Sequence, residues 1–338
     1  MGFSSFKYVC LCAAIVIGIA SVSVVLNDRP AAAAAENCGC HPHMAAQKFV
    51  HIPVKNGDCQ LCHKSSGERH PKVKKGAFTY TGNGKSGLCN ECHERKDTMK
   101  FVHTPVASGD CRDCHDVHQS NYRYQLKEVG SALCFTCHEK AKFERKYPHA
   151  PVVEGRCLSC HDPHQSNVKF MLKAEGANLC LTCHEKAHFK GKSVHPPVVA
   201  GECTSCHTTH GTSFPHLLKQ NYPEDFYIPF DKGQYALCFT CHNSSMADEQ
   251  RTDTQTNFRN GTFNLHFAHV NKPDKGRSCK VCHDPHAAGQ AKLISTKIGG
   301  FGQWRIPIRY SKTSAGGTCV VGCHKPKSYN RINQFDNP

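Results

Sequence analysis

The sequence predicts a fold of mostly irregular coil with short α-helices and little β-structure, arranged around an array of covalently attached groups. The first observation behind this is that the 338 residues include 24 Cys and 25 His, which points to a metal or cofactor. The second is that long apolar periodic runs are missing after residue 30, so the chain buries little aliphatic surface. The third is a short phrase of Cys and His that recurs along the chain. Something other than aliphatic side chains must therefore fill the interior.

Residues 1–35 have the features of an export signal. Lys7 supplies a positive charge, residues 8–26 form an uncharged apolar run, and the small residues of 31–36 suit a signal peptidase. At 19 residues the run is also long enough to span a bilayer. We therefore expect either a cleaved signal peptide or an N-terminal membrane anchor. Both alternatives place the remaining chain outside the cytoplasm, in the periplasm, either free or associated with a membrane.

The chain is basic, with 42 Lys and Arg against 27 Asp and Glu and a formal net charge of +15. Such an excess is found in proteins that bind nucleic acid or anionic lipid. An exported chain does not meet nucleic acid, so we expect no nucleic-acid partner. An acidic cofactor carried in many copies would also offset the positive charge, and we favour this interpretation.

The repeated phrase is Cys-x-x-Cys-His, and it occurs nine times. A tenth copy, CVVGCH, has one extra residue, and an eleventh, CGCH at Cys38, Cys40 and His41, has one too few. The cysteines of the first ten are Cys59 and Cys62, Cys89 and Cys92, Cys111 and Cys114, Cys134 and Cys137, Cys157 and Cys160, Cys180 and Cys183, Cys203 and Cys206, Cys238 and Cys241, Cys279 and Cys282, and Cys319 and Cys323.

This spacing is that of a c-type haem attachment site. Two thiols three residues apart can each form a thioether to one vinyl group of the porphyrin. On a helical turn, positions i, i+3 and i+4 share a face, so the histidine after the second Cys is aimed at the iron. Zinc ribbons also use Cys-x-x-Cys pairs but rarely require His next to the second Cys. Disulfides at this spacing throughout would make an unusual framework. Haem is the favoured interpretation.

The motifs alternate between two kinds of phrase. Type A phrases, such as HAPVVEGRCLSCHDPH (149–164), contain Pro, Gly and Asp and are typical of a loop plus one turn. Type B phrases, such as NLCLTCHEKAHF (178–189), have a Glu–Lys run after the motif and predict a helix. From Cys111 to Cys203 the first cysteines recur every 23 residues, which marks a quasi-linear array. We expect an irregular CxCH segment over 36–50 and a domain of five A–B pairs over 51–338.

Histidines in these phrases are the candidate iron ligands. The histidine that ends each motif is the expected proximal ligand: His63, His93, His115, His138, His161, His184, His207, His242, His283 and His324. Each type A phrase adds one histidine before its first Cys and one after the motif, which makes ten candidate distal ligands: His51 and His70, His103 and His118, His149 and His164, His195 and His210, and His269 and His286.

The number of distal candidates equals the number of motifs, which favours bis-histidine ligation at low potential. The histidine three residues after a motif cannot easily reach round its own haem, so we expect it to bind a neighbour's iron. Methionine, the other common sixth ligand, holds no constant place in the repeat. Four histidines remain, namely His43, His188, His216 and His266, and we expect them to be solvated or hydrogen-bonded rather than ligating.

The two irregular motifs differ in what they predict. The expanded loop of CVVGCH is compatible with haem attachment. In CGCH, one residue between the thiols strains the span to both vinyl groups. An eleventh haem there, with His41 proximal and His43 or another histidine distal, is one alternative. The others are a disulfide, an intermolecular contact or an idle remnant.

From these motifs the chain resembles the doubled Cys-x-x-Cys-His multihaem c-type cytochromes over residues 38–324, and in particular the periplasmic decahaem subunit of porin–cytochrome conduits. The resemblance implies a multihaem cytochrome c fold and about ten covalently bound haem c groups. It implies an electron carrier in anaerobic or extracellular respiration. Its donor would be another cytochrome or a quinol dehydrogenase, and its acceptor an outer-membrane porin–cytochrome complex or an extracellular acceptor.

The sequence is also compatible with two other functions. An oxyanion reductase would need one iron with an open coordination position, and every motif here ends in His. A subunit of an extracellular cytochrome filament is compatible with the repeat. We favour the carrier, with no catalytic residue.

Two segments depart from the repeat. Residues 243–268 are polar, lack a motif and predict a surface loop inserted into the array. Residues 304–310, WRIPIRY, alternate in polarity and predict a short strand.

Overall fold

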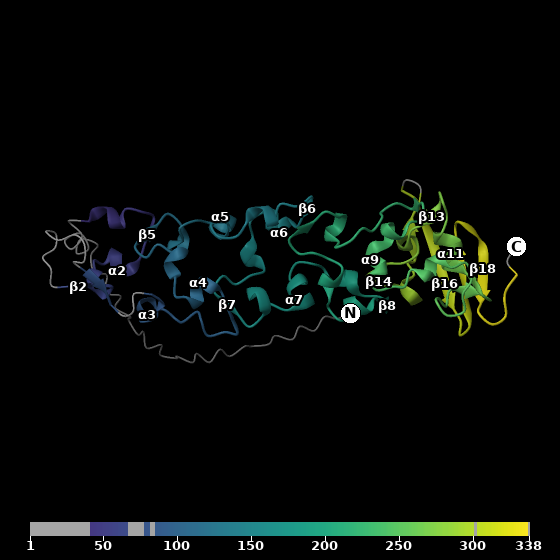
Figure 1. The fold of residues 1–338 in the computed structure, drawn as a ribbon, viewed down its shortest axis with the longest axis horizontal. Helices are drawn as coiled ribbons and strands as arrows, with labels where there is room; N and C mark the ends of the chain where they lie inside the picture. The colour runs from purple at the N-terminus through teal and green to yellow at the C-terminus, as the bar shows by residue number, and fades with distance from the viewer. Residues whose placement is uncertain (1–40, 67–77, 82–84, 301–302, 337–338) are drawn as a thin grey trace, which may run out of the picture.

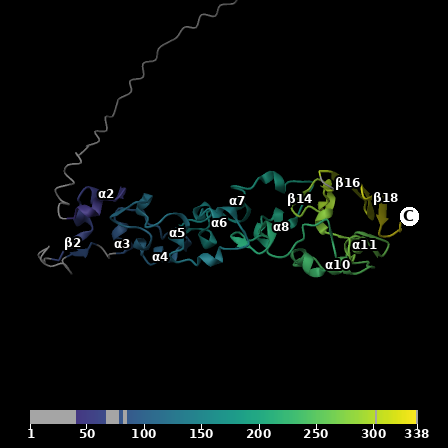
Figure 2. The same ribbon diagram turned by 90° about the horizontal axis from the view of Figure 1, so that it is seen from above.

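The structure is a computed structural model that describes residues 41–66, 78–81, 85–300 and 303–336. The predicted signal segment 1–35, Cys38, Cys40 and His70 lie outside the described residues. The chain forms one elongated body along which the elements follow one another broadly in sequence order, although β14 (Ala287–Ala288) returns to lie beside β8 (Ser193–Val194) (Figures 1 and 2). Within the described ranges, no helix has the length and apolar character needed to cross a membrane.

The helices are short and belong to the repeat. The α-helices are α2 (Ile52–Lys55), α3 (Ser86–Cys89), α4 (Thr104–Ala107), α5 (Gly130–Cys134), α6 (Ala150–Val153), α7 (Gly176–Cys180), α8 (Pro196–Val199), α9 (Ala236–Phe239), α10 (Ser245–Asp248) and α11 (Leu265–Val270). Those of type A phrases start directly after the leading histidine with Pro at the first or second position, where a missing N–H costs nothing. The glycine that follows each of them, such as Gly155 at φ 67°, takes the left-handed conformation and ends the helix.

The helix predicted for the type B phrase forms, but it covers only the start of the phrase. α5 and α7 end at the first cysteine of their motif, and the Glu–Lys runs form only 3₁₀ turns over Lys140–Lys142 and Lys186–Phe189. The motif itself continues the turn, because the motif histidine donates its backbone N–H to the first cysteine's carbonyl, as His138 does to Cys134 at 2.9 Å. The shared face expected for Cys, Cys and His is thereby formed.

Four two-stranded ladders join each type A phrase to the next one, and we call them clasps. In every clasp, the strand just before the leading histidine pairs antiparallel with the strand just after the trailing histidine of the next type A phrase. The clasps are β1 (Phe49–Val50) with β5 (Gln119–Ser120), β4 (Phe101–Val102) with β7 (Gln165–Ser166), β6 (Tyr147–Pro148) with β9 (Gly211–Thr212), and β8 (Ser193–Val194) with β14 (Ala287–Ala288).

The prediction of little β-structure is not confirmed. About 23% of the described residues lie in strands or isolated bridges. The largest sheet is antiparallel and lies at the C-terminal end, in the order β15 (Lys297–Gly299), β16 (Arg305–Lys312), β17 (Gly316–Val321), β18 (His324–Asn330). The strand predicted over 304–310 is confirmed as β16. Smaller ladders join β2 (His63–Ser65) to β3 (Phe78–Tyr80), β10 (Tyr227–Ile228) to β13 (Gly276–Arg277), and β11 (Arg259–Asn260) to β12 (Phe263–Asn264).

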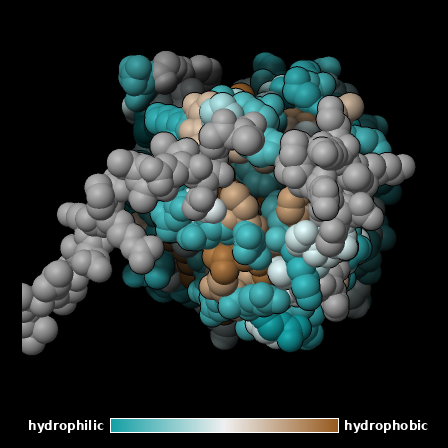
Figure 3. All heavy atoms as spheres, turned by 90° about the vertical axis from the view of Figure 1, so that its left-hand side faces the viewer, coloured by the Kyte–Doolittle hydropathy of each residue, from teal (hydrophilic) through white to brown (hydrophobic). Residues whose placement is uncertain are grey.

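A conventional hydrophobic core exists only in the C-terminal third. Among the described residues, every buried apolar side chain is Leu218 or later in the chain. One cluster centres on Tyr235 and Val270, and another on Val281, Ile306 and Ile308. Before Leu218, large apolar side chains are exposed instead, namely Ile52, Leu61, Phe78, Tyr80, Met99, Val117, Tyr124, Val129, Val153, Leu158, Phe170 and Val199. The N-terminal end accordingly shows hydrophobic residues among hydrophilic ones (Figure 3).

The polar insertion 243–268 is a folded element, not a plain surface loop. Asn264 is fully buried. Its side-chain oxygen accepts from the N–H groups of His266 and Phe267 at 2.9 and 3.3 Å, capping α11, and its amide donates to the carbonyls of Met246 and Glu249 at 2.9 and 2.7 Å. These four bonds fasten α11 to α10.

We expect Asn264→Ala to lower the free energy of unfolding by roughly 2–4 kcal/mol, because it removes four hydrogen bonds of a fully buried side chain, including the cap of α11. Denaturant unfolding followed by circular dichroism measures this. The exposed Asn333 offers a matched control, since Asn333→Ala is the same substitution at the surface. Equal midpoints for the two variants would contradict the role given to Asn264.

Candidate functional site

Nine pairs of histidine rings face each other along the body, and we call them ring pairs. Their centroids are 5.9–6.4 Å apart and their planes lie within 28° of parallel. The ring pairs are His51–His93, His63–His118, His103–His138, His115–His164, His149–His184, His161–His210, His195–His242, His207–His286 and His266–His283. Each contains one motif histidine and one histidine from outside any motif.

The pairing follows a rule. The leading histidine of a type A phrase faces the motif histidine of the type B phrase that comes next, as His149 faces His184. The trailing histidine faces the motif histidine of the preceding type A phrase, as His210 faces His161. The geometry thus agrees with the expectation that a trailing histidine serves a neighbouring motif.

The ring pairs have the dimensions that a bis-histidine haem requires. A metal about 2.0 Å from a nitrogen of each ring, the usual metal–imidazole distance, puts two opposed ring centroids about 6 Å apart. That matches the observed 5.9–6.4 Å. The two cysteines of each motif lie beside its histidine, and every cysteine in the described part of the chain is a free thiol. Two axial nitrogens with two adjacent thiols fit one covalently attached haem.

Hydrogen bonds set the protonation of these rings. The Nδ1 atoms of His51, His103, His149 and His195 lie 3.0–3.1 Å from backbone carbonyls of the next type A phrase. Those of the motif histidines His115, His161, His207 and His283 lie 2.8–3.0 Å from carbonyls nine residues downstream. A carbonyl can only accept, so Nδ1 carries the proton in each ring. The lone pair is left on Nε2, the atom that must bind the metal.

The downstream carbonyls belong to residues in the left-handed region, which sequence reasoning did not identify. Tyr124, Phe170, His216 and Lys292 have φ between 54° and 63°, and the next residue in each case is also left-handed. This conformation is unfavourable for non-glycine residues, costing of order 1 kcal/mol. It recurs nine residues after the motif histidine in four successive type A phrases, but four different residue types occupy the position, so the sequence carries no residue signal for it.

The Asp of the CHDPH phrase positions the trailing histidine. Asp162 Oδ1 accepts from the N–H groups of His164 and Gln165 at 2.9 and 3.2 Å. Asp116 and Asp284 make the same turn. The leading histidine of the preceding phrase then donates its N–H to the trailing histidine's carbonyl, as His103 does to His164 at 2.9 Å. We call the non-motif histidine of each ring pair its outer ring. One clasp therefore holds the outer rings of two ring pairs.

Cysteines of successive motifs lie next to one another. Burial first, and then the neighbouring Cys157 thiol, raises the pKa of Cys134 to about 11, and burial with the Cys203 thiol raises the pKa of Cys180 to about 11. Likewise, burial and then the Cys111 thiol raise the pKa of Cys89. Each contact joins a type B motif to the type A motif that follows it. The motifs therefore form a single row in sequence order.

Five of the histidines named from the sequence fall outside the rule. His269 lies on α11, where burial lowers its pKa, with His324 among the weaker causes. None of the ring pairs includes His324, which is exposed at the start of β18. His41 and His43 meet edge to face, with centroids 5.9 Å apart and planes at 70°. His70 lies outside the described residues.

The remaining histidines divide differently from the prediction. His188 and His216 are exposed and pair with carboxylates, 3.5 Å from Glu185 and 2.5 Å from Glu224, in agreement with solvated positions. His266 does not fit the prediction of a solvated side chain, because it forms the ring pair with His283. Burial lowers the pKa of His266 to about 4, so the ring is neutral at physiological pH. The polar, motif-free insertion gave no sequence signal for it.

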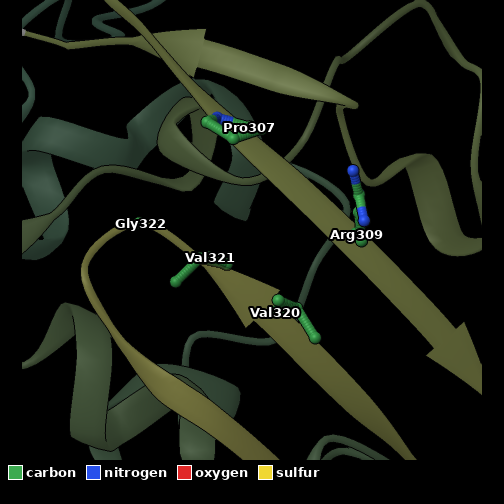
Figure 4. Close-up of a pocket in the computed structure, with 5 residues that line it drawn as sticks. All are labelled: Pro307, Arg309, Val320, Val321 and Gly322. Atoms are coloured by element: carbon green, nitrogen blue, oxygen red, sulfur yellow. The ribbon is translucent and has the colours of Figure 1, made fainter.

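The tenth motif has a different local structure. Cys319 lies in β17 and His324 begins β18, so CVVGCH forms the turn of a β-hairpin and not a helical turn. Cys319 packs against the cluster of Val281, Ile306 and Ile308. A shallow hollow of about 260 Å³ lies against the same hairpin, lined by Pro307, Arg309, Val320, Val321 and Gly322 (Figure 4). It contains no cysteine or histidine and is separate from the ring pairs.

Comparison with known protein families agrees with this geometry. A model described as the doubled CXXCH motif matches residues 103–143, 149–189 and 195–247. A model described as cytochrome c7 and related cytochrome c matches residues 44–116. No curated protein matches the chain. Both family descriptions imply covalently bound haem c.

The pairing rule predicts which haem loses a ligand when one histidine is removed. We expect His149→Ala to produce one high-spin ferric signal in electron paramagnetic resonance, because His184 loses its partner. Adding Cys180→Ser and Cys183→Ser should abolish that signal by removing the affected haem.

Removing the haem of the same phrase, with Cys157→Ser and Cys160→Ser, is the matched control and should leave the high-spin signal in place. If the signal disappeared with this control and survived the other pair of substitutions, the pairing rule would be wrong.

Proposed function

Because the chain belongs to the multihaem c-type cytochromes, we propose that it carries electrons along a row of ten bis-histidine haems between two redox partners. The observation that supports this most is the set of nine ring pairs ordered along one elongated body. A haem held by two histidines has no open coordination position. Such a row can pass electrons between neighbouring haems but offers no iron to a substrate, which favours a carrier over an oxyanion reductase.

Contacts between successive motifs support transfer from haem to haem. The thiol neighbours Cys89 and Cys111, Cys134 and Cys157, and Cys180 and Cys203 place each type B motif against the next type A motif. Within one A–B pair of phrases, Cys114 lies near Cys137. In the same way, Cys206 lies near Cys238 and Cys241. Every motif in these series therefore has its sequence neighbours as spatial neighbours, and an electron need not bypass any of them.

The charge balance supports a high haem number. Each haem carries two propionates, so ten haems would bring roughly twenty negative charges, partly offset by ferric iron. The chain's formal charge of +15 is of the opposite sign and similar size. Lys and Arg side chains along the row would then neutralise propionates and tune the potentials.

We further propose a periplasmic location and a role in anaerobic or extracellular respiration. The apolar run 8–26 and the small residues after it support export. A quinol dehydrogenase or another cytochrome would supply electrons at one end. An outer-membrane porin–cytochrome complex or an extracellular acceptor would receive them at the other end. An elongated row suits this role, because its two ends are far apart (Figure 1).

Intact mass of the purified holoprotein, combined with a reductive titration, tests the proposal. We expect a mass increase equal to ten haems and uptake of about ten electrons per chain. The reduced protein should not bind carbon monoxide, since every iron already has two axial ligands.

A colourless folded protein, or one with zinc or disulfides at the motifs, would refute the proposal. Carbon monoxide binding by one haem of the native protein would instead favour the reductase.

A further inference from the structure

We propose that the inserted segment completes the array by supplying the outer ligands of its last two haems: His266 for the haem of Cys279 and Cys282, and His269 for that of Cys319 and Cys323. This inference rests on the proposed function. It assigns a ligand role to a residue that the repeat does not predict. It also assigns a positioning role to Thr256.

The pairing rule fails at the end of the chain for a simple reason. A type A motif takes its outer histidine from the trailing position of the next type A phrase, and His283 belongs to the last of these phrases. After His286 the sequence contains only one histidine, His324, which belongs to the tenth motif. His286 itself already faces His207. His283 therefore needs a ligand from elsewhere.

α11 supplies that ligand. The ring of His266 lies 6.4 Å from that of His283 with planes 28° apart, within the range of the other ring pairs. Nδ1 of His283 lies 3.0 Å from the Lys292 carbonyl, the same arrangement as in the preceding type A phrases. The motif histidine is thus held as in the earlier phrases, and only the segment that supplies the facing histidine differs.

The assignment of His269 follows from the part of the pairing rule that concerns leading histidines. It holds the leading position of the last type A phrase, and a leading histidine serves the next type B motif, which here is CVVGCH. Positions i and i+3 lie on neighbouring parts of one helix face, so His266 and His269 can present their rings to two adjacent sites. Nδ1 of His269 lies 2.6 Å from the Leu265 carbonyl, which leaves Nε2 for metal binding.

Thr256 orients the His266 ring. Its buried hydroxyl lies 3.0 Å from His266 Nδ1 and accepts from the N–H of Phe258 at 3.0 Å. The Phe258 ring packs edge-on against His266 with centroids 5.1 Å apart and against Tyr329 of β18. The leading histidines of the earlier phrases have a backbone carbonyl at Nδ1, whereas His266 has a side-chain hydroxyl that a substitution can remove.

The core around α11 explains why the insertion is folded. Asn264 fastens α11 to α10, and Val270 packs with Tyr235 and Ala247 in an apolar cluster. Earlier repeats gain their outer ligands from clasps with the next phrase. At α11 a conventional core holds the ligand instead.

The test compares His266→Ala with His188→Ala, an exposed histidine outside every ring pair, in holoprotein of verified haem number. We expect one high-spin centre per molecule in His266→Ala and none in His188→Ala. The high-spin signal should vanish when Cys279→Ser and Cys282→Ser are added. Low-spin iron at every haem in His266→Ala would overturn the proposal for His266.

Two further variants keep the test decisive if His266→Ala does not fold. His266→Met retains a ligand, and we expect the full haem number with one centre at a higher reduction potential. Thr256→Val removes the hydrogen bond while conserving volume. It should shift the potential of one centre and leave all ten low-spin, whereas Thr256→Ser should restore the original value. An unchanged redox titration in both His266→Met and Thr256→Val would contradict the assignment.

His269 is tested in the same way. His269→Ala should give one high-spin centre that disappears when Cys319→Ser and Cys323→Ser are added, and its survival in that background would exclude His269 as the ligand of the tenth haem. Wild-type protein without haem would refute the proposed function itself. Wild-type protein with ten low-spin haems and an unaffected His266→Ala would refute only the present inference.

Discussion

The distance between two facing histidine rings is the constraint on which the rest of the structure depends. Each ring pair must hold two imidazoles about 6 Å apart and near-parallel, with Nε2 free on both. The two rings come from different parts of the chain, so each ring pair can form only when two separate segments are held together. The clasps, the Asp turns and the left-handed residues all help to hold the two rings in this geometry. Each of them fixes a backbone segment that carries or hydrogen-bonds a ring.

This constraint also explains how a chain with so little apolar interior can fold. Ordering a residue costs about 1–2 kcal/mol in backbone entropy, and burial of aliphatic side chains is the usual source of compensation. Among the described residues before Leu218 that source is missing, because no apolar side chain there is buried. Large apolar side chains such as Ile52, Leu158 and Phe170 are exposed in the polypeptide alone, so only a bound group could cover them. Covalently bound haem c, which both family descriptions imply, would provide that surface.

Much of the site could be predicted from the sequence, because covalent attachment demands fixed local spacing. The sequence predicts the motif turns, the alternation of two phrases and eight of the non-motif histidines that form ring pairs. The choice of partners was harder to predict. A clasp such as β4 with β7 joins segments more than sixty residues apart through two residues each, too short to leave a strand pattern in the sequence.

Three features lacked a usable local signal. The type B helix ends at its first cysteine, since the Glu–Lys run that predicted a longer helix forms only a 3₁₀ turn in solvent. CVVGCH forms a hairpin because β16 and β18 flank β17, a tertiary effect that overrides the motif's usual turn. His266 sits in a polar insertion that is held by a buried asparagine and by an apolar cluster from distant parts of the chain.

Iron-edge anomalous diffraction from crystals of the holoprotein is the most direct test of the account. It should reveal ten iron atoms in a single row, nine of them midway between the two rings of a ring pair, with one between His115 and His164 and one between His266 and His283. Iron atoms bound to one histidine only, or lying away from the ring pairs, would show that facing imidazoles are not what organises this molecule.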